Sequence, residues 1–443
     1  MKKVLFLAYL FPPIANSGTQ RPWKFAKYLA DYGWQPTVIT AADLDGHHID
    51  SGLSADLPAN VDVVRVPMLN DQIGATLAAL AGGGRLGKRV GDAISWRIRQ
   101  RRRSPDLYAL WKPTVMRAAM KIFHERGFDA IYATGFPWTA LIAGAELSQA
   151  TGRPLVADFR DLWAGDPMFP EGRPSHAEEV ALERSVVEQA TTVVGASASI
   201  GRQLAATHPS VSEEKFVTIH NGFDAEDFTE PRVRPTAQRF RIVYTGVWKE
   251  GYNPAELYDT IDWIRRSRPA LLENAEVITA GFAPGEARRR GLSAYIEERG
   301  VVSHQAAVAL MRSADILFLS HTSPDRQWAV PGKLYEYLAS QSPVLALTSP
   351  NNEMAQIIRA VGGGIAVPHD DPGTLLDVIG EACRAGKLNV PERQVEALNL
   401  FERRQLTAKL AAVLDEAATH APMHHTALRM DAGSSSMLAT RSS

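Results

Sequence analysis

Lys333 and Glu336 form the pair of residues in this chain whose types and spacing best suit a specific chemistry. They follow the turn residues Pro331 and Gly332, so the sequence predicts that both lie in the first turn of a helix. Residues three apart share one helix face, and a helix N-terminus favours negative charge. The lysine would therefore neutralise a diphosphate while the glutamate accepts hydrogen bonds from a ribose. An exposed ion pair on an ordinary amphipathic helix has the same spacing and is the alternative interpretation.

A second polar group stands at the end of a predicted buried strand at residues 154–159. Asp158, Arg160 and Asp161 cluster there, close to Trp163. Ligands of doubly wound sheets bind at the carboxyl ends of the strands, so this cluster predicts a site for a polar, ring-shaped substrate. The alternative is an internal Arg–Asp ion pair that braces the loop.

Two glycine-containing loops follow the first strands of the two halves of the chain. In the loop at residues 11–21, Gly18 allows close approach of a ligand to the backbone and Arg21 adds a positive charge. A simple turn with a helix N-cap would have the same composition. In the second half, Gly246 keeps the backbone open and Lys249 lies within reach of a phosphate.

The sequence lacks the motifs of several other nucleotide-binding classes. No G-x-G-x-x-G motif follows the first strand and no Walker A motif occurs, so nicotinamide, flavin and P-loop nucleotide binding lose support. His47–His48 and His424–His425 lie in polar segments without metal-ligand spacing. We therefore expect neither a cofactor nor a metal ion.

Composition indicates a cytoplasmic protein of more than one domain. The chain has 443 residues and a net charge of −1, which gives no case for nucleic acid binding. Its single cysteine, Cys383, excludes an intrachain disulfide and fits a reducing compartment. We expect no signal peptide, because the apolar run after Lys2 and Lys3 breaks at Pro12–Pro13, and no membrane-spanning segment.

The periodicity predicts alternating strands and helices twice over, which is typical of two doubly wound α/β domains. Strands are expected at residues 4–10, 36–40, 61–67, 129–134, 154–159, 191–196 and 215–219, and again at 240–245, 275–280, 315–320, 344–348 and 364–367. The predicted domains are residues 1–228 and 239–399, joined by a polar linker with prolines. A last helix is expected at residues 400–420, and a disordered tail at 421–443.

The order and spacing of these segments resemble a retaining nucleotide-sugar glycosyltransferase of the family-four type. The similarity covers roughly residues 1–415. The matching segments are Phe11-Pro12-Pro13 through Gly18, Asp158–Trp163, Asn221-Gly222-Phe223-Asp224, Gly246 with Lys249, Ala314–Leu317 and Pro331–Leu338. The resemblance implies the GT-B fold, in which two Rossmann-like domains face each other across a cleft. It also implies transfer of a sugar from a nucleoside-diphosphate sugar with retention of anomeric configuration.

The resemblance assigns roles to the residues singled out above. Donor binding falls on Gly18, Gly246, Lys249, Lys333 and Glu336, acceptor binding on Arg21, Asp158 and Trp163, and catalysis on Arg160, Asp161 and Lys249. Gly18 and Arg21 are expected to face the cleft. Front-face attack assisted by the leaving phosphate is the usual proposal for the family, so no protein nucleophile is implied. Lysines and a helix N-terminus would stabilise the leaving diphosphate without a metal.

Three positions depart from the family pattern. Trp328 stands where the first of two family glutamates often lies, eight residues before Glu336. Val247 replaces an arginine that often follows the glycine. Arg160–Asp161 occupies the place of a His-Asp pair in many members. The phosphate charge would therefore rest on Lys249 and Lys333, and the departures leave the contacts of the donor sugar and of the acceptor open.

A basic segment at residues 85–103 suggests where the acceptor resides. Its eight cations face one acid, Asp92, and are Arg85, Lys88, Arg89, Arg97, Arg99, Arg101, Arg102 and Arg103. With Trp96 and Ile98, these side chains suit an anionic membrane surface. This predicts peripheral attachment to the inner face of the membrane and a polyprenyl-diphosphate-linked sugar as acceptor, in cell-surface polysaccharide synthesis. A solvated basic loop is the alternative.

Two other functions fit the same sequence features. A sugar-nucleotide 2-epimerase would share the fold and the donor site but would convert the free nucleotide sugar without an acceptor. A two-domain sugar-binding protein without catalysis is the second alternative, and the cysteine usage and expected lack of a signal peptide argue against a periplasmic one.

Overall fold

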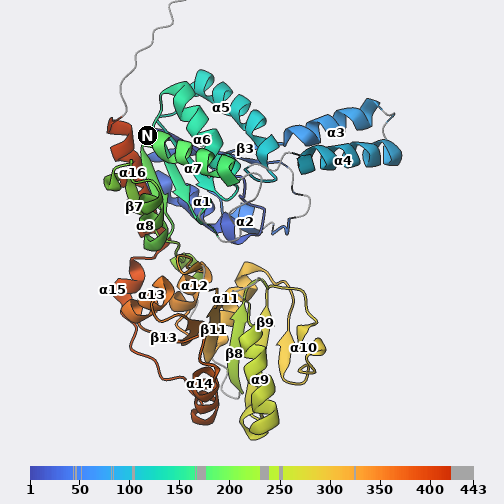
Figure 1. Cartoon of the computed structure of the whole chain (residues 1–443), viewed down its shortest axis with the longest axis vertical. Coiled ribbons are helices and arrows are strands. Elements are labelled where there is room, and N and C mark those ends of the chain that lie inside the picture. The colour runs from blue at the N-terminus through green and yellow to red at the C-terminus, as the bar shows by residue number, and fades with distance from the viewer. Residues whose placement is uncertain are drawn as a thin grey trace, which may run out of the picture.

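The computed structural model describes most of the chain. It describes residues 1–42, 44, 47–50, 52–80, 82, 84–101, 105–164, 166, 176–229, 239–248, 253–323 and 326–420. Two parallel sheets form, one in each half of the chain, and helices lie on both faces of each sheet (Figure 1). The predicted α/β architecture of two doubly wound domains is therefore confirmed.

The first sheet has seven parallel strands in the order β3-β2-β1-β4-β5-β6-β7. The strands are β1 (Lys2–Leu7), β2 (Trp34–Ala41), β3 (Asp62–Val66), β4 (Ala130–Gly135), β5 (Leu155–Phe159), β6 (Thr192–Gly195) and β7 (Phe216–Thr218). Val4 pairs with Pro36 on one side and with Ala130 on the other. The central strands are buried on both faces, which explains their unbroken apolar sequences.

The second sheet has six parallel strands in the order β10-β9-β8-β11-β12-β13. They are β8 (Phe240–Thr245), β9 (Ala275–Ala280), β10 (Ile296–Glu298), β11 (Ile316–His321), β12 (Val344–Thr348) and β13 (Gly364–Val367). The sequence did not predict β10. This edge strand has three residues and only Ile296 is buried, so it carries no alternating pattern.

Helices and short 3-10 turns cover the sheets. Those of the first half include α1 (Ser17–Tyr28), η1 (Leu29–Tyr32), α2 (Gly52–Ala55), η2 (Ala109–Trp111), α5 (Lys112–Arg126), α6 (Trp138–Thr151), α7 (His176–Gln189), α8 (Ala198–Thr207), η3 (Glu213–Lys215) and η4 (Ala225–Phe228). Those of the second half are α9 (Ala255–Ser267), η5 (Pro269–Leu272), α10 (Glu286–Arg289), α11 (His304–Ser313), α12 (Lys333–Ala339), α13 (Glu353–Val361), α14 (Pro372–Ala385) and α15 (Val395–Asn399). Each sheet thereby has an apolar core on both of its faces.

The last helix, α16 (Arg403–His420), returns to the first domain (Figure 1). Leu406, Leu410 and Leu414 are buried in the same core cluster as Phe6, and α16 packs on α1. Within the segment predicted as a last helix at residues 400–420, the helix of the structure begins at Arg403. The domain boundary predicted near residues 229–238 stays a prediction, because residues 230–238 lie outside the described part of the chain, as does the tail from 421.

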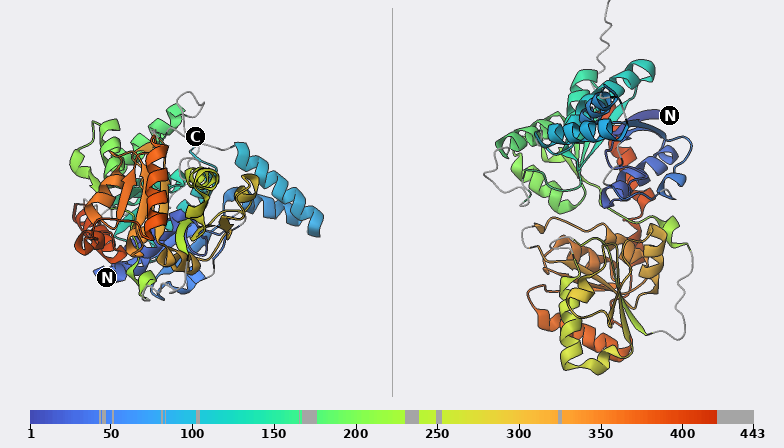
Figure 2. Two further views of the ribbon diagram at one scale, coloured as in Figure 1. Left: turned by 90° about the horizontal axis from the view of Figure 1, so that it is seen from below. Right: turned by 90° about the vertical axis from the view of Figure 1, so that its right-hand side faces the viewer.

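Two antiparallel helices project from the first domain, as Figures 1 and 2 both show. We call α3 (Leu69–Leu80) and α4 (Gly84–Arg101) the helical hairpin. Gly74 and Gly91 let the helices approach closely, since a Cβ on Gly74 would lie 2.8 Å from the Gly91 carbonyl oxygen. The basic segment predicted from residue 85 onward therefore forms a helix as far as Arg101. Among the described residues, no helix combines the length and the apolar character needed to cross a bilayer.

Candidate active site

Lys333 lies beside the carboxyl end of β8. Its Nζ donates to the Tyr244 hydroxyl at 2.8 Å and sits 4.0 Å from the centre of the Tyr244 ring. Gly246, directly after the strand, has a φ of 147°, and a Cβ there would collide with the Lys333 amine. The glycine is therefore required so that the lysine can reach the end of the strand. The resemblance assigned both residues to donor binding, and the structure places them side by side.

The surroundings of Lys333 disfavour its charge. Burial lowers the pKa of its amine to about 7, because desolvation penalises the ammonium. Among the described residues, no ion pair is formed by Lys333 that would offset this penalty. An arriving dianion would restore the charge, so the site is suited to a phosphate group.

Glu336 is on the same helix turn and contacts a residue that the sequence reasoning missed. Glu336 Oε1 lies 3.0 Å from Nε2 of His304, the first residue of α11. Helix α12 itself is held against β8, because Tyr337 OH accepts a hydrogen bond from the Thr245 amide at 2.8 Å. Lys333 and Glu336 thus lie in the first turn of a helix, as the sequence predicted, and this helix is held against β8.

An open hollow of about 460 Å³ lies beside Gly246. Its lining is partly aromatic and comprises Val247, Trp248, Gly281, Phe282, Ala283, Pro284, Glu286 and Arg289. Trp248 and Phe282 meet edge to face with ring centres 5.2 Å apart. The end of β8 therefore borders a space that a ring-shaped group could enter.

In the first domain, Arg21 and Asp158 form a fully buried ion pair. Arg21 Nη2 donates to Asp158 Oδ1 at 2.7 Å and Nε donates to Oδ2 at 2.9 Å. Asp158 also accepts from the hydroxyls of Tyr132 at 2.6 Å and Thr134 at 2.8 Å. Burial works to raise the pKa of Asp158, but Arg21 and these hydrogen bonds hold it below its usual value.

Arg21 and Asp158 were predicted to bind the acceptor directly, and Arg21 to face the cleft. The structure disagrees, because the two side chains are 1% and 0% exposed and satisfy each other. Trp163 was also predicted to contact the acceptor. It is fully buried and stacks on Trp138, with ring centres 5.4 Å apart. The alternative of an internal Arg–Asp pair is nearer to the structure, although Asp158 pairs with Arg21 instead of Arg160.

Arg160 binds backbone carbonyl groups. Its Nε donates to the Gly135 carbonyl at 2.7 Å, and its guanidinium also contacts the carbonyls of Phe136 and Gly18. A Cβ on Gly18 would lie 2.5 Å from Arg160 Nη1, so the glycine gives room to the arginine. Arg160 therefore braces the loops at the carboxyl ends of the neighbouring strands. Its predicted catalytic role and the donor-binding role of Gly18 stay predictions.

Asp161 is the exposed acid of this cluster, at 44% of its side chain. It faces the second domain, where Nη2 of Arg326 lies 3.6 Å from Asp161 Oδ1 and 2.9 Å from Asp166 Oδ2. Arg326 is itself buried and its guanidinium lies 4.7 Å from the centre of the Trp328 ring. Asp161 thus stands at the boundary between the domains.

Trp328, the residue in place of a family glutamate, belongs to this boundary. It is buried in the apolar core cluster of the first domain, and its carbonyl accepts from Ser197 Oγ at 2.7 Å. Nearby, the carboxylate of Glu353 accepts from the amides of Ala198 at 2.9 Å and Ser199 at 2.7 Å. An acidic side chain at the N-terminus of α8 is stabilising. The tryptophan therefore joins the two domains.

The structure thus brings Gly246 and Lys333 together, and it places Glu336 in the same helix turn as Lys333. Lys249, predicted for donor binding and catalysis, lies outside the described residues. The sequence did not indicate a role for His304. A single histidine that follows a serine indicates at most that the serine caps the start of a helix. Within the described ranges, no cluster of three His, Cys, Asp or Glu residues suits a metal ion.

Comparisons with known proteins identify the fold and the first domain. Residues 18–222 match the family described as Glycosyl transferase 4-like domain. A search of curated proteins found no match. Solved structures align with nearly the whole chain at low identity, among them the following three.

Sucrose-phosphate synthase from Thermosynechococcus elongatus is 12% identical, with 95% of this chain and 97% of that chain covered and a TM-score of 0.58. HepE from Anabaena, in complex with UDP-glucose, is 16% identical, with 95% and 98% covered and a TM-score of 0.54. A trehalose 6-phosphate synthase from Burkholderia multivorans is 11% identical, with 94% and 97% covered and a TM-score of 0.61. With the two parallel sheets, these structures show that the chain has the GT-B fold, and residues 18–222 match a glycosyl transferase 4-like domain.

Proposed function

We propose that this protein transfers a sugar from a nucleoside-diphosphate sugar to an acceptor with retention of anomeric configuration. The observation that carries the proposal is Lys333 beside Tyr244 and Gly246 at the carboxyl end of β8, with Glu336 in the same turn of α12. Lys333 binds the diphosphate and Glu336 binds the ribose. HepE, a structural neighbour, holds UDP-glucose, which supports a nucleotide sugar as the donor.

The leaving group sets the electrostatic demand of this reaction. As the glycosidic bond to the phosphate breaks, negative charge grows on the diphosphate, and a fixed cation at that position lowers the barrier. Lys333 meets this demand because its amine is held in place by Tyr244 at 2.8 Å. We propose that no divalent metal is required, since the ammonium and the neighbouring amides of α12 supply the compensating charge.

The acceptor is bound by the first domain, with Asp161 as its nearest exposed acid. In place of direct contacts, Arg21, Asp158 and Arg160 hold the loops that form the floor of the acceptor site. Asp161 is available to the acceptor hydroxyl, because Arg326 donates its hydrogen bond to Asp166 at 2.9 Å and lies 3.6 Å from Asp161. This division of roles replaces the direct contacts expected from the sequence.

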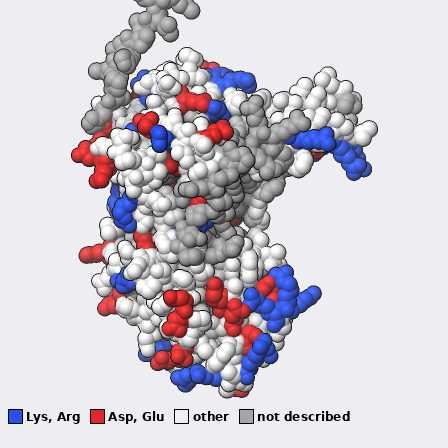
Figure 3. Space-filling view, in the orientation of Figure 1, with Lys and Arg blue, Asp and Glu red and all other residues white. Residues whose placement is uncertain are grey.

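The helical hairpin points to a lipid-linked acceptor. Its described cations Arg85, Lys88, Arg89 and Arg97 are exposed, and Figure 3 shows Lys and Arg gathered along one edge of it. Large apolar side chains are exposed beside them, Leu86 at 77% and Trp96 at 61%. Exposed apolar groups among cations suit an anionic membrane surface. We propose that the hairpin holds the enzyme at the membrane where a polyprenyl-linked sugar of cell-surface polysaccharide synthesis is presented.

A thermal-shift panel of UDP, GDP, ADP and dTDP tests the donor site. A ligand at 100 times its dissociation constant stabilises the folded state by about 2.7 kcal/mol. One diphosphate should raise the melting temperature of the wild-type protein well above the others. Equal melting temperatures with all four would contradict the proposal. Incubation with the matching nucleotide sugar alone then separates a transferase, which leaves the sugar unchanged apart from slow hydrolysis, from an epimerase, which converts it.

A further inference from the structure

His304 occupies an unusual position for a basic residue. It is the first residue of α11, whose N-cap Ser303 accepts from the Ala306 amide at 3.3 Å. A helix N-terminus repels positive charge, so an imidazolium there needs nearby anions. Glu336 is one of them, with Oε1 3.0 Å from His304 Nε2. The two side chains are 21% and 19% exposed, so the pair is largely shielded from solvent.

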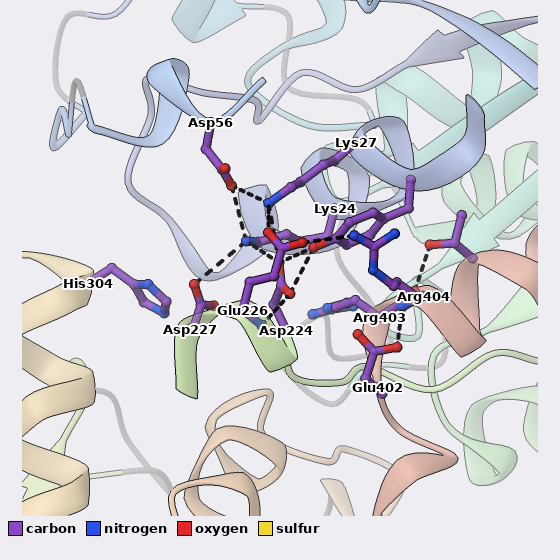
Figure 4. Close-up of polar contacts among 12 residues, drawn as sticks. Lys24, Lys27, Asp56, Asp224, Glu226, Asp227, His304, Glu402, Arg403 and Arg404 are labelled. Atoms are coloured by element: carbon purple, nitrogen blue, oxygen red, sulfur yellow. Dashed lines mark hydrogen bonds and ion pairs between the residues drawn. The ribbon is translucent and has the colours of Figure 1, made fainter. Parts of the chain in front are cut away.

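A second anion faces His304 from the segment that joins the domains. Figure 4 shows the imidazole beside Asp227 of η4. Asp227 in turn lies 3.8 Å from Nζ of Lys24, a buried residue of α1 that also pairs with Asp224 at 2.5 Å. The charged groups around His304 are thus Glu336 on α12, Asp227 on η4 and Lys24 on α1.

These groups favour the charged form of the histidine. Burial disfavours the imidazolium, and the charge of Lys24 disfavours it weakly. The hydrogen bond to Glu336, the negative charge of Glu336 and the negative charge of Asp227 outweigh these effects and raise the pKa of His304 to about 9. At neutral pH both ring nitrogens therefore carry protons, and Nε2 donates to Glu336.

We propose that His304 is a positioning residue for nucleotide binding, which fixes Glu336 so that its carboxylate meets the ribose hydroxyls. The inference rests on the proposed donor site. A carboxylate has about four acceptor positions, so Glu336 can accept from His304 and still accept from two hydroxyls. Without the histidine, the glutamate would rotate freely, and ordering it on binding would weaken affinity by about two- to tenfold.

Calorimetric titration of the full chain with UDP and with 2′,3′-dideoxy-UDP tests the inference. His304→Ala should weaken UDP binding about two- to tenfold and leave dideoxy-UDP binding unchanged, because only the ribose hydroxyls need Glu336. His304→Gln, which keeps an N–H donor, should recover part of the loss. In a Glu336→Ala background, His304→Ala should have no further effect.

A second His–Glu pair provides a matched control. In the first domain, His208 Nε2 lies 3.0 Å from Glu183 Oε1, the same distance as in the proposed site. His208→Ala should leave UDP affinity unchanged.

The outcomes separate the two proposals. Absence of nucleotide binding by the wild-type protein, with UDP and with the other three diphosphates of the panel, would remove the proposed donor site. If Glu336→Ala weakens UDP binding but His304→Ala does not, the positioning role of His304 alone is wrong. Equal weakening of UDP and dideoxy-UDP by His304→Ala would also overturn it, since that result indicates a general structural role.

Discussion

Replacement of Asp158 by alanine should lower the stability of the first domain, and it should not remove a direct contact with the substrate. The substitution removes the carboxylate that accepts from Arg21, Tyr132 and Thr134, with the shortest bonds at 2.7, 2.6 and 2.8 Å. It leaves the Arg21 guanidinium buried without its counter-ion. Stranding a buried charge is far costlier than losing an exposed ion pair.

The expected loss follows from the burial of both partners. Breaking a buried ion pair by removing one side costs about 3–5 kcal/mol. For a domain of this size, 1 kcal/mol shifts the melting temperature by about 2–4 °C, so Asp158→Ala should lower it by roughly 6–20 °C. Asp161→Ala is the matched control, because its side chain is 44% exposed and 3.6 Å from Arg326. A pair of that kind contributes at most about 1 kcal/mol.

Differential scanning calorimetry of the two variants and the wild-type protein measures the shift. The first-domain transition should fall for Asp158→Ala and stay within a few degrees for Asp161→Ala. The reasoning would be refuted if Asp158→Ala melted like the wild-type protein but failed to use the acceptor. Asp158 would then contact the acceptor, as the sequence alone predicted.

Three further predictions concern charge. Between pH 7 and 8.5, the dissociation constant of the nucleoside diphosphate should rise by up to about tenfold per pH unit, because the pKa of Lys333 is about 7 and its amine must take up a proton to bind the diphosphate. In calorimetric titrations, the Lys333→Arg variant should lose this pH dependence, because arginine is always charged. A dissociation constant of the wild-type protein that does not change with pH would exclude this role of Lys333. Sugar transfer should persist in EDTA, and activity abolished by EDTA and restored by magnesium or manganese would contradict metal independence. The fraction of protein that floats with anionic vesicles should decrease as the salt concentration rises, since salt screens charges beyond about 8 Å. It should also decrease when serine replaces Arg85, Lys88 and Arg89. Absence of binding to anionic vesicles even at low salt would leave the hairpin without a membrane role.

Much of the fold is predictable because its strands are buried on both faces. Runs such as Leu5–Leu7 and Leu345–Leu347 are continuous apolar segments between turn residues, and the structure places strands at both. The helical hairpin was not predicted as such, because its helices have no buried stripe against the domain. Its close packing depends on Gly74 and Gly91, which lie far enough apart that no local pattern connects them.

The candidate site was predictable where its residues are close in sequence. Lys333 and Glu336 share one helix turn, so spacing alone placed them together. Arg21 and Asp158 are 137 residues apart, and only the packing of α1 across the sheet makes them partners. His304 and Glu336 are 32 residues apart on different helices, so their contact likewise depends on the tertiary fold.

The most direct test of the donor site is calorimetric titration of the nucleoside diphosphate selected by the panel into the wild-type protein and Glu336→Ala. Hydrogen bonds to a charged group contribute about 1.5–3 kcal/mol, so the variant should bind about ten- to 150-fold more weakly. Without ligand the variant should still fold, with a melting temperature somewhat below that of the wild-type protein because the contact with His304 is lost. An unchanged dissociation constant in Glu336→Ala would place the nucleotide elsewhere and contradict the proposed site.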